Sequence, residues 1–347
     1  MIDDELQVLG KPHKMSKKTK WLISISAIAL MILCVVLGMI IHSSLSPQQT
    51  IKIKSGKKIG DPTIVPELQT IVDSILNANM TEIGNCLQGQ AIVMDVETGE
   101  ILAMSGLERN FEGKFQPCKN FAYQQELGQL TQTASLLALF ERGIDSTYVV
   151  HTGVGIWGVD DSWVLRDHNW RRGGYGDLNL ARAMETSSNI GIGVPVWKFY
   201  KGHEQDFFDD LNKMNFGQPD FINGIEGLKP TAYDSPKDSI NPQIASKDNI
   251  KKMQVILDHV VSQGLGRKAG SLMIRVAGKP GTSQVGEYDF GEDTFVTEYQ
   301  LAFCGYFPAD KPKYSMIVSI NKLGLPASGG GMAGVVFHDI MEWMITQ

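Results

Sequence analysis

A long apolar run lies near the start of the chain. Residues 21–41 read WLISISAIALMILCVVLGMII, in which only Ser24, Ser26 and Gly38 fall outside the apolar set and no residue is charged. A helix of this length rises about 31 Å, which matches the hydrocarbon core of a bilayer. The run follows five lysines, which are Lys11, Lys14, Lys17, Lys18 and Lys20. Because positive charge prefers the cytoplasmic side, the pattern predicts a transmembrane helix whose N-terminus lies inside the cell.

This run divides the chain into four predicted parts. Residues 1–20 form a basic cytoplasmic head, residues 21–41 the transmembrane helix, residues 42–60 a polar stalk, and residues 61–347 an extracytoplasmic domain. A cleaved signal peptide is the alternative interpretation. The run is longer than the usual core of a signal peptide, and no small-x-small cleavage site follows it cleanly. The sequence therefore favours an uncleaved, single-pass anchor.

The outer part begins with patterns typical of a helix and a strand hairpin. Apolar residues recur at helical spacing over residues 66–79. Residues 90–96 and 101–105 are predicted strands on either side of residues 97–100, whose glycine suits a hairpin turn. Residues 128–142 follow as a strongly apolar predicted helix.

The middle of the domain is predicted to be irregular and helical, and its end returns to strands. Residues 144–176 are rich in Gly, Trp and Asp and are typical of loops, whereas residues 177–185 are expected to form a helix. Residues 216–250 are mostly irregular, and a helix is expected over residues 248–263. The last predicted elements are strands over 272–277, 283–288, 297–306 and 314–320, and a helix from about Gly334. This order predicts an α+β domain with an antiparallel sheet flanked by helices, built from both ends of the domain, with a helical insertion.

Composition narrows the classes of function. Hydrophobic residues make up 43% of the chain and charged residues 20%, which is ordinary for a folded protein and excludes wholesale disorder. The net charge of −6 supplies no excess of positive charge for phosphate groups. No nucleic-acid partner is therefore expected.

Cysteine usage permits one disulfide bridge. The four cysteines are too few for a disulfide-rich scaffold, and Cys34 lies within the predicted membrane helix. An extracytoplasmic compartment would allow one bridge among the other three. Cys86–Cys118 is the favoured pair, because Cys304 lies in the apolar run LAFCGYF and is expected in the core. Three unpaired thiols remain the alternative.

Five segments occur in an order and spacing that resemble a known family. Residues 91–104 cover the predicted hairpin, residues 166–169 read RDHN, residues 180–189 read LARAMETSSN, residues 276–284 read VAGKPGTSQ, and residues 303–314 read FCGYFPADKPKY. Together they resemble the transpeptidase domain of class B-like penicillin-binding proteins, in the serine β-lactamase and transpeptidase superfamily. The resemblance covers the whole outer domain. It implies a role in bacterial cell-wall synthesis, with the domain on the periplasmic side of the inner membrane.

The nucleophile motif of that family is degenerate in this chain. The family carries E-P-G-S-x-x-K at the start of its core helix, where the serine attacks the D-Ala-D-Ala stem peptide and the lysine one turn later takes its proton. Residues 126–132 read ELGQLTQ and align with this motif, which puts Gln129 at the serine position and Gln132 at the lysine position. A carboxamide is neither a useful nucleophile nor a base at neutral pH. The resemblance therefore implies a disabled acylation site with no confident catalytic residue.

Two neighbouring hydroxyls are alternative nucleophiles. Thr131 and Ser135 lie on the same predicted helix, but Ala134 and Ala138 stand three residues after them, so neither has a lysine one turn on. Hydroxyls in a helix commonly bond back to the carbonyl of the preceding turn. This structural role is the favoured interpretation of both.

The other two motifs of the family are kept in part. Ser187 and Asn189 match S-x-N, in which the family's serine joins the proton relay and its asparagine holds the substrate amide. Lys279, Gly281 and Thr282 match K-T-G-T. The resemblance implies that this lysine attracts the substrate carboxylate, the glycine allows close backbone approach, and the Thr282 position supplies an N–H of the oxyanion hole. These five residues are the predicted substrate groove.

Pro280 departs from that pattern. Proline has no N–H and is confined to strand edges, starts or bulges, so it is tolerable in a strand that borders a substrate groove. The structural alternatives are a self-capping loop at Ser187 and a solvated lysine at Lys279.

Two further patterns are interpreted as structural. Residues 329–334 spell G-x-G-x-x-G before a helix, but too little chain follows for a dinucleotide-binding unit, so a turn and close helix–strand packing are expected. His151, His168, His203 and His338 show no metal-ligand spacing, and no metal or cofactor is implied.

Three hypotheses of function follow. The favoured one is a membrane-anchored pseudoenzyme that binds the peptidoglycan stem peptide, a β-lactam without acylation, or a protein of cell-wall synthesis or division. The second is an active D,D-transpeptidase or carboxypeptidase with a non-standard nucleophile. The third is a structural assembly subunit in which the groove has no role.

Overall fold

The computed structural model describes residues 63–118, 128–160, 163–214, 243–289 and 295–347. The predicted head, membrane helix and stalk lie outside these described residues. Within the described ranges, no helix is long and apolar enough to cross a membrane. All of the described residues belong to one compact unit.

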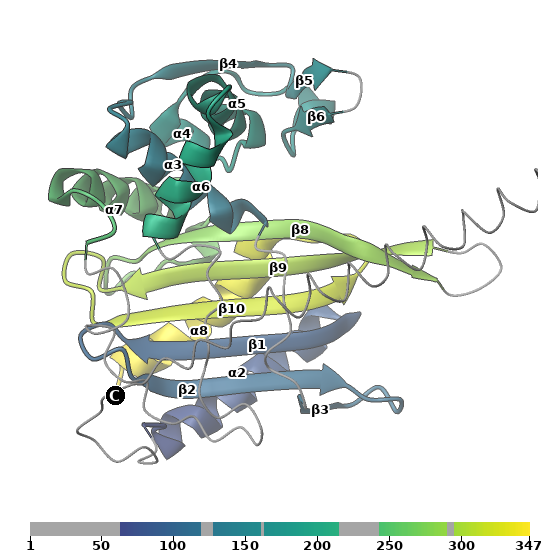
Figure 1. Ribbon diagram of the computed structural model, residues 1–347. Helices are drawn as coiled ribbons and strands as arrows, with labels where there is room; N and C mark the ends of the chain where they lie inside the picture. The colour runs from purple at the N-terminus through teal and green to yellow at the C-terminus, as the bar shows by residue number, and fades with distance from the viewer. Residues whose placement is uncertain (1–62, 119–127, 161–162, 215–242, 290–294) are drawn as a thin grey trace, which may run out of the picture. The chain divides into compact units, whose positions relative to one another are not determined.

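The domain is built on one six-stranded antiparallel sheet with the strand order β3-β2-β1-β10-β9-β8 (Figure 1). Its strands are β1 (Cys86–Asp95), β2 (Ile101–Arg109), β3 (Phe115–Pro117), β8 (Ala277–Asp289), β9 (Phe295–Phe307) and β10 (Tyr314–Leu323). β1 pairs with β10 in a register that sets Ala91 opposite Val318. The early hairpin and the last strands therefore share one sheet, as the order of the predicted elements indicates.

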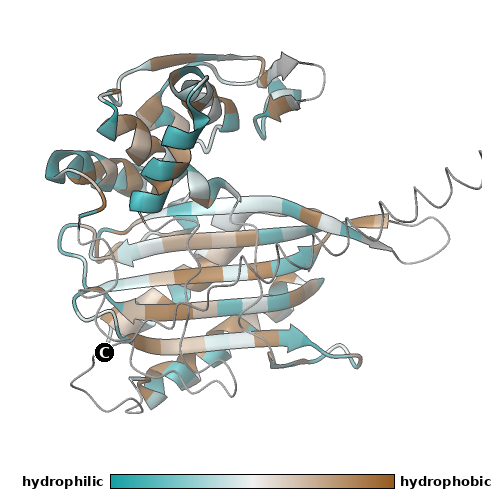
Figure 2. Ribbon diagram, viewed as in Figure 1, coloured by the Kyte–Doolittle hydropathy of each residue, from teal (hydrophilic) through white to brown (hydrophobic). Residues whose placement is uncertain are grey.

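Two helices from opposite ends of the domain cover one face of the sheet. In Figure 1, α2 (Pro66–Ile83) and α8 (Gly334–Ile345) both lie behind the strands. Apolar and polar residues alternate along the strands, as the colour bands in Figure 2 show. The apolar face packs against fully buried side chains of both helices, among them Val72, Leu76 and Phe337. This alternation is the pattern expected of an antiparallel sheet with one face packed on a core.

A helical insertion between β3 and β8 forms a second core. It contains α3 (Thr131–Glu141), α4 (Leu180–Glu185), α5 (Asn189–Tyr200), α6 (Glu204–Lys213) and α7 (Lys247–Ser262). The short 3-10 turn η1 (Gly128–Leu130) leads into α3. Apolar side chains of these helices pack together and are buried, including Leu136, Leu139, Met184, Ile190 and Val260. The α+β architecture with a helical insertion is therefore confirmed.

Several predicted boundaries were wrong. The segment interpreted as loop, residues 144–176, contains the paired strands β4 (Val149–Gly153) with β7 (Gly176–Asn179), and β5 (Ile156–Asp160) with β6 (Trp163–Arg166). β7 also takes the first residues of the helix expected from residue 177, so α4 begins at Leu180. Residues 272–276 are not a strand, and the strand expected over 283–288 is the second half of the long β8. The segment expected to be irregular, residues 216–250, lies mostly outside the described residues, and α7 begins within its end.

No disulfide bridge joins the three described cysteines, Cys86, Cys118 and Cys304. Cys86 and Cys118 are buried, and the Nε2 of Gln88 donates a hydrogen bond to the Cys118 sulfur over 2.9 Å. The Cys86–Cys118 bridge is therefore not formed. The expectation that Cys304 lies in the core was also wrong, because this residue is exposed. Its neighbour Phe303 takes the core-facing position instead.

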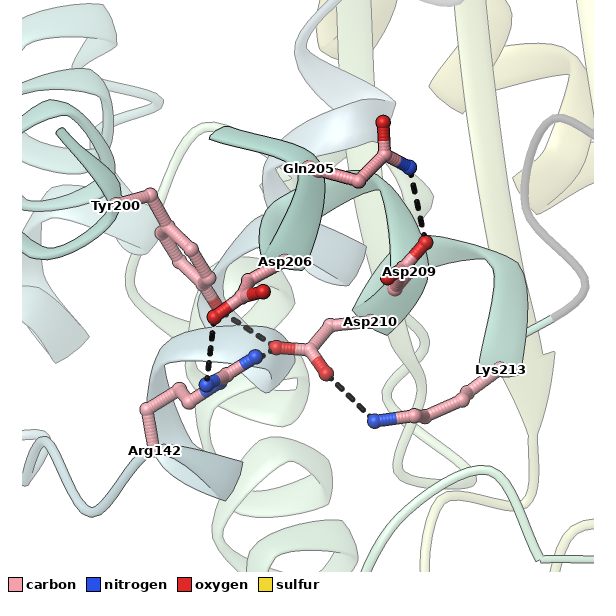
Figure 3. A network of polar contacts seen from close by, with 7 residues as sticks. All are labelled: Arg142, Tyr200, Gln205, Asp206, Asp209, Asp210 and Lys213. Atoms are coloured by element: carbon pink, nitrogen blue, oxygen red, sulfur yellow. Dashed lines mark hydrogen bonds and ion pairs between the residues drawn. The ribbon is translucent and has the colours of Figure 1, made fainter. Parts of the chain in front are cut away.

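A buried carboxylate joins three helices of the insertion (Figure 3). Asp210 on α6 accepts hydrogen bonds from Arg142 Nε over 2.7 Å, Lys213 Nζ over 2.9 Å and the Tyr200 hydroxyl over 3.0 Å. Burial opposes ionisation of Asp210, but these donors outweigh it and hold the pKa of the carboxyl below its usual value. The network fixes α6 against the ends of α3 and α5.

Candidate functional site

Three segments that are distant in the sequence meet at one place. They are the start of the core helix with Gln129 and Gln132, the loop between α4 and α5, and the first half of β8. Direct hydrogen bonds join the start of the core helix to each of the other two segments, and join the loop to β8. The fold therefore brings the residues of the three predicted motifs together.

Gln129 contacts the strand that carries the third motif. The backbone N–H of Thr282 donates a hydrogen bond to the side-chain oxygen of Gln129 over 2.7 Å. β8 is an edge strand, and residues two apart in a strand direct their N–H groups to the same side. The nitrogen of Pro280 therefore also faces away from β9, so this proline removes no hydrogen bond from the sheet.

Gln132 contacts the second motif. Its Nε2 donates to the backbone oxygen of Ser188 over 3.3 Å and to the Asn189 Oδ1 over 3.2 Å. Asn189 in turn donates from Nδ2 to the backbone oxygen of Arg166 over 2.9 Å, which fixes the orientation of both carboxamides. The Oε1 of Gln132 is buried and has no hydrogen-bond partner among the described residues. A lysine at this position would donate to the same two oxygens and leave no acceptor unpaired.

Ser187 and Lys279 form the third contact. The Nζ of Lys279 lies 2.6 Å from the Ser187 Oγ and 3.0 Å from the backbone oxygen of Pro280. Lys279 is only 2% exposed, and burial lowers the pKa of its ammonium to about 7. It is therefore not the solvated turn lysine that was the structural alternative. Ser187 has a φ of 51°, a left-handed conformation that is uncommon for a residue other than glycine.

Asp167 is a residue of the site that the sequence analysis did not single out. Its carboxylate is fully buried and accepts a hydrogen bond from the Ser188 hydroxyl over 2.8 Å and from the Ile190 N–H over 3.0 Å. The Ile190 N–H lies in the first turn of α5, where the positive end of the helix dipole favours a carboxylate. Asp167 therefore holds the loop that carries Ser187 and Asn189. The signal was its place in the RDHN segment.

The two alternative hydroxyls bond back to their own chain. The Oγ1 of Thr131 donates to the backbone oxygen of Gly128 over 2.9 Å, and the Oγ of Ser135 donates to that of Thr131 over 3.1 Å. The structural interpretation of both is therefore confirmed.

The glycine-rich turn packs against β8. A Cβ atom on Gly329 would lie 2.1 Å from the backbone oxygen of Gly281, and the Gly329 N–H donates to the Thr282 Oγ1 over 2.9 Å. The close packing predicted for residues 329–334 therefore supports the strand at Gly281 and Thr282. Among the described residues, no group of His, Cys, Asp and Glu side chains is arranged to hold a metal ion.

Comparison with known sequences finds the family that the motifs resemble, in two overlapping matches that cover most of the domain. The family model described as the penicillin-binding protein transpeptidase domain matches residues 89–226 and 212–342. The peptidoglycan D,D-transpeptidase MrdA of Acinetobacter baumannii is 29% identical over 136 residues, which is 37% of this chain and 20% of that protein. Stage V sporulation protein D of Bacillus subtilis is 33% identical over 102 residues, 29% of this chain and 15% of that protein. The aligned segments thus span about a fifth or less of these curated relatives.

Solved structures share the fold. The transpeptidase domain of Burkholderia pseudomallei penicillin-binding protein 3 has a TM-score of 0.62 and 21% identity, covering 84% of this chain and 97% of that one. Penicillin-binding protein 3 of Mycobacterium tuberculosis, complexed with aztreonam, has a TM-score of 0.60 and 19% identity, covering 82% and 78%.

Proposed function

Because the chain belongs to the family of penicillin-binding protein transpeptidase domains, we propose that it is a membrane-anchored pseudoenzyme of peptidoglycan synthesis. It recognises the acyl-D-Ala-D-Ala stem peptide without forming a covalent intermediate. One observation supports this proposal: Gln129 and Gln132, which the resemblance aligns with the nucleophile and the base, are hydrogen-bonded to Thr282 and Asn189, while Lys279 keeps its contact with Ser187.

The chemistry of the two glutamines argues against acylation. Acyl transfer needs a nucleophile activated by an adjacent base. The Gln129 carboxamide is not a nucleophile, and the Gln132 carboxamide donates two hydrogen bonds but takes no proton. Thr131 does not replace the lost serine, because its hydroxyl is bonded to its own chain.

The retained residues supply the groups needed for recognition. Lys279 is a buried amine whose pKa is lowered by burial, so a ligand carboxylate beside it would stabilise the charged form. Ser187 lies next to it on a loop that Asp167 holds in place, and Asn189 begins the helix that follows this loop. This arrangement suits the carboxylate and amide groups at the end of a stem peptide.

Membrane attachment is the second part of the proposal. The apolar run over residues 21–41 and the lysines before it support a single-pass anchor with the domain on the periplasmic side. A protease added to spheroplasts should then remove the outer domain and spare the N-terminal head. Complete protection of the chain would contradict this orientation.

The experiment that tests the proposed function uses the full chain in detergent. A fluorescent penicillin should leave no covalent label, whereas diacetyl-L-Lys-D-Ala-D-Ala should bind measurably by calorimetry. Gln129→Ser combined with Gln132→Lys should restore labelling, because this variant returns the nucleophile and base to a site that is otherwise assembled. Labelling of the unmodified chain would favour an active enzyme with another nucleophile, and absence of peptide binding would favour an assembly subunit.

A further inference from the structure

We infer that the Gln129 side chain is an internal ligand of the Thr282 N–H, so that a carbonyl ligand has to displace it to bind. The inference rests on the proposed function, in which the stem peptide is recognised at this site. Its starting point is the 2.7 Å hydrogen bond from the Thr282 N–H to the Gln129 side-chain oxygen. An amide oxygen of the side chain is the same kind of acceptor as the carbonyl oxygen of a peptide or a β-lactam.

The contact is fixed from the side of Gln129. Gly128, directly before it, has a φ of 53°, and a Cβ atom there would lie 3.0–3.2 Å from backbone atoms of Thr282. The turn is therefore packed directly on β8. The Thr131 hydroxyl bonds to the Gly128 oxygen and holds the turn in this shape. The backbone of Gln129 is therefore held in position by this turn, independently of the hydrogen bond that its side chain makes.

The contact is also fixed from the side of Thr282. The Thr282 Oγ1 accepts a hydrogen bond from the Gly329 N–H over 2.9 Å, which ties this residue to the glycine-rich turn. The Thr282 N–H points outward from the edge of the sheet, so it is available to a group on η1 or to a ligand but not to β9. Gln129 and a carbonyl ligand therefore compete for one donor.

The second glutamine, Gln132, occupies the side-chain oxygen of Asn189. Gln132 is 6% exposed and donates to Asn189, the residue that the family resemblance assigns to the substrate amide. Asn189 is held by Arg166 as well, so its carboxamide is engaged on both sides. The contact of Gln129 has a consequence for binding. In the unmodified chain, the apparent affinity for a carbonyl ligand is reduced by the fraction of molecules in which Gln129 occupies the Thr282 N–H.

The test compares two single variants of the full chain in detergent. Gln129→Ala removes the competing oxygen and should raise the affinity for diacetyl-L-Lys-D-Ala-D-Ala about tenfold, the factor expected for one net hydrogen bond. Gln129→Glu keeps the size and the acceptor, so it should show no gain in affinity. Equal affinities of the unmodified chain and Gln129→Ala would overturn the internal-ligand inference and leave the proposed function intact.

Hydrogen–deuterium exchange of the Thr282 amide supplies a readout that needs no ligand. Exchange should be about tenfold faster in Gln129→Ala than in the unmodified chain and unchanged in Gln129→Glu. Unchanged exchange in Gln129→Ala would overturn the inference even if no peptide binds. Loss of peptide binding in all three proteins, with the expected exchange pattern, would reject the proposed function and retain the internal ligand.

Discussion

The ammonium nitrogen of Lys279 lies 2.6 Å from the hydroxyl oxygen of Ser187, 92 positions away in the sequence. This contact joins the edge strand of the sheet to the helical insertion at a place where both residues are unusual. Lys279 is a buried amine, and Ser187 has a left-handed backbone. Strained or desolvated residues of this kind concentrate at functional sites, so the contact supports this place as the candidate site.

The buried lysine should make stability depend on pH. Burial lowers the pKa of Lys279 to about 7 in the folded state, whereas the pKa of an unfolded lysine is about 10.4. Between these values the unfolded state binds more protons, so the free energy of unfolding should rise with pH, by about 1.4 kcal/mol per unit. Below about pH 7 the lysine is charged in both states, so the full cost of burying its ammonium group lowers the stability of the folded protein. Urea unfolding of the unmodified chain and of Lys279→Met should therefore give a stability difference that changes with pH over this window.

The matched control is Lys268→Met, which removes an exposed lysine. Its stability difference from the unmodified chain should stay flat over the same pH range. A flat difference for Lys279→Met as well would show that Lys279 is not desolvated in the folded protein.

The Asp167 carboxylate should be needed for the shape of the site. Asp167→Asn replaces an acceptor with an NH₂ group opposite the Ser188 hydroxyl, which already accepts a hydrogen bond from the Gly191 N–H over 2.8 Å. The expected loss is about 2 kcal/mol in the free energy of unfolding, together with weaker peptide binding. Asp177→Asn is the control, because the Asp177 side chain is 65% exposed. Equal stability of the two variants would contradict the positioning role of Asp167.

Periodicity predicted the layers of the fold better than the contacts within the insertion. The α2 helix and the β1–β2 hairpin follow from apolar spacing, because each buries one face on a large core. The α5 helix was not predicted, since Gly191, Gly193 and Pro195 lie within it and lower its intrinsic helix propensity. Tertiary packing of Ile190, Ile192 and Val194 overrides that propensity.

Most residues of the site were predictable from the sequence, whereas Asp167 and the hydrogen bonds between the residues were not. Motif order placed Gln129, Gln132, Ser187, Asn189 and Lys279 in one site, and their hydrogen bonds now join them. The contact between Gln129 and Thr282 spans 153 positions and depends on side-chain direction, which no local pattern encodes. The absence of the Cys86–Cys118 bridge was not predictable either, because the distance between two cysteines is a property of the fold.

The Asp210 network should stabilise the insertion above the acidic range. Asp210→Asn removes a buried charge that Arg142, Tyr200 and Lys213 contact, so a loss of about 2 kcal/mol is expected at neutral pH. Because the folded pKa of Asp210 is lowered, its contribution is present above about pH 4 and is lost as the pH falls through the folded value. The stability gap between the two proteins should therefore shrink in acid. Asp209→Asn, on the exposed side of the same helix, should cost little at any pH.

A final prediction concerns the packing of the glycine-rich turn behind the site. In Gly329→Ala, the new Cβ atom would lie 2.1 Å from the Gly281 oxygen and 2.6 Å from the Ala302 oxygen, so β8 or the turn has to move. We expect a loss of about 2 kcal/mol or more in the free energy of unfolding and faster exchange of the Thr282 amide, because the clash falls on Gly281, the residue directly before Thr282. Gly286→Ala is the matched control on the same strand, where an added Cβ meets no atom within 4 Å. If the two variants are equally stable, the turn does not support the strand, and the geometry that places Thr282 against Gln129 needs another source.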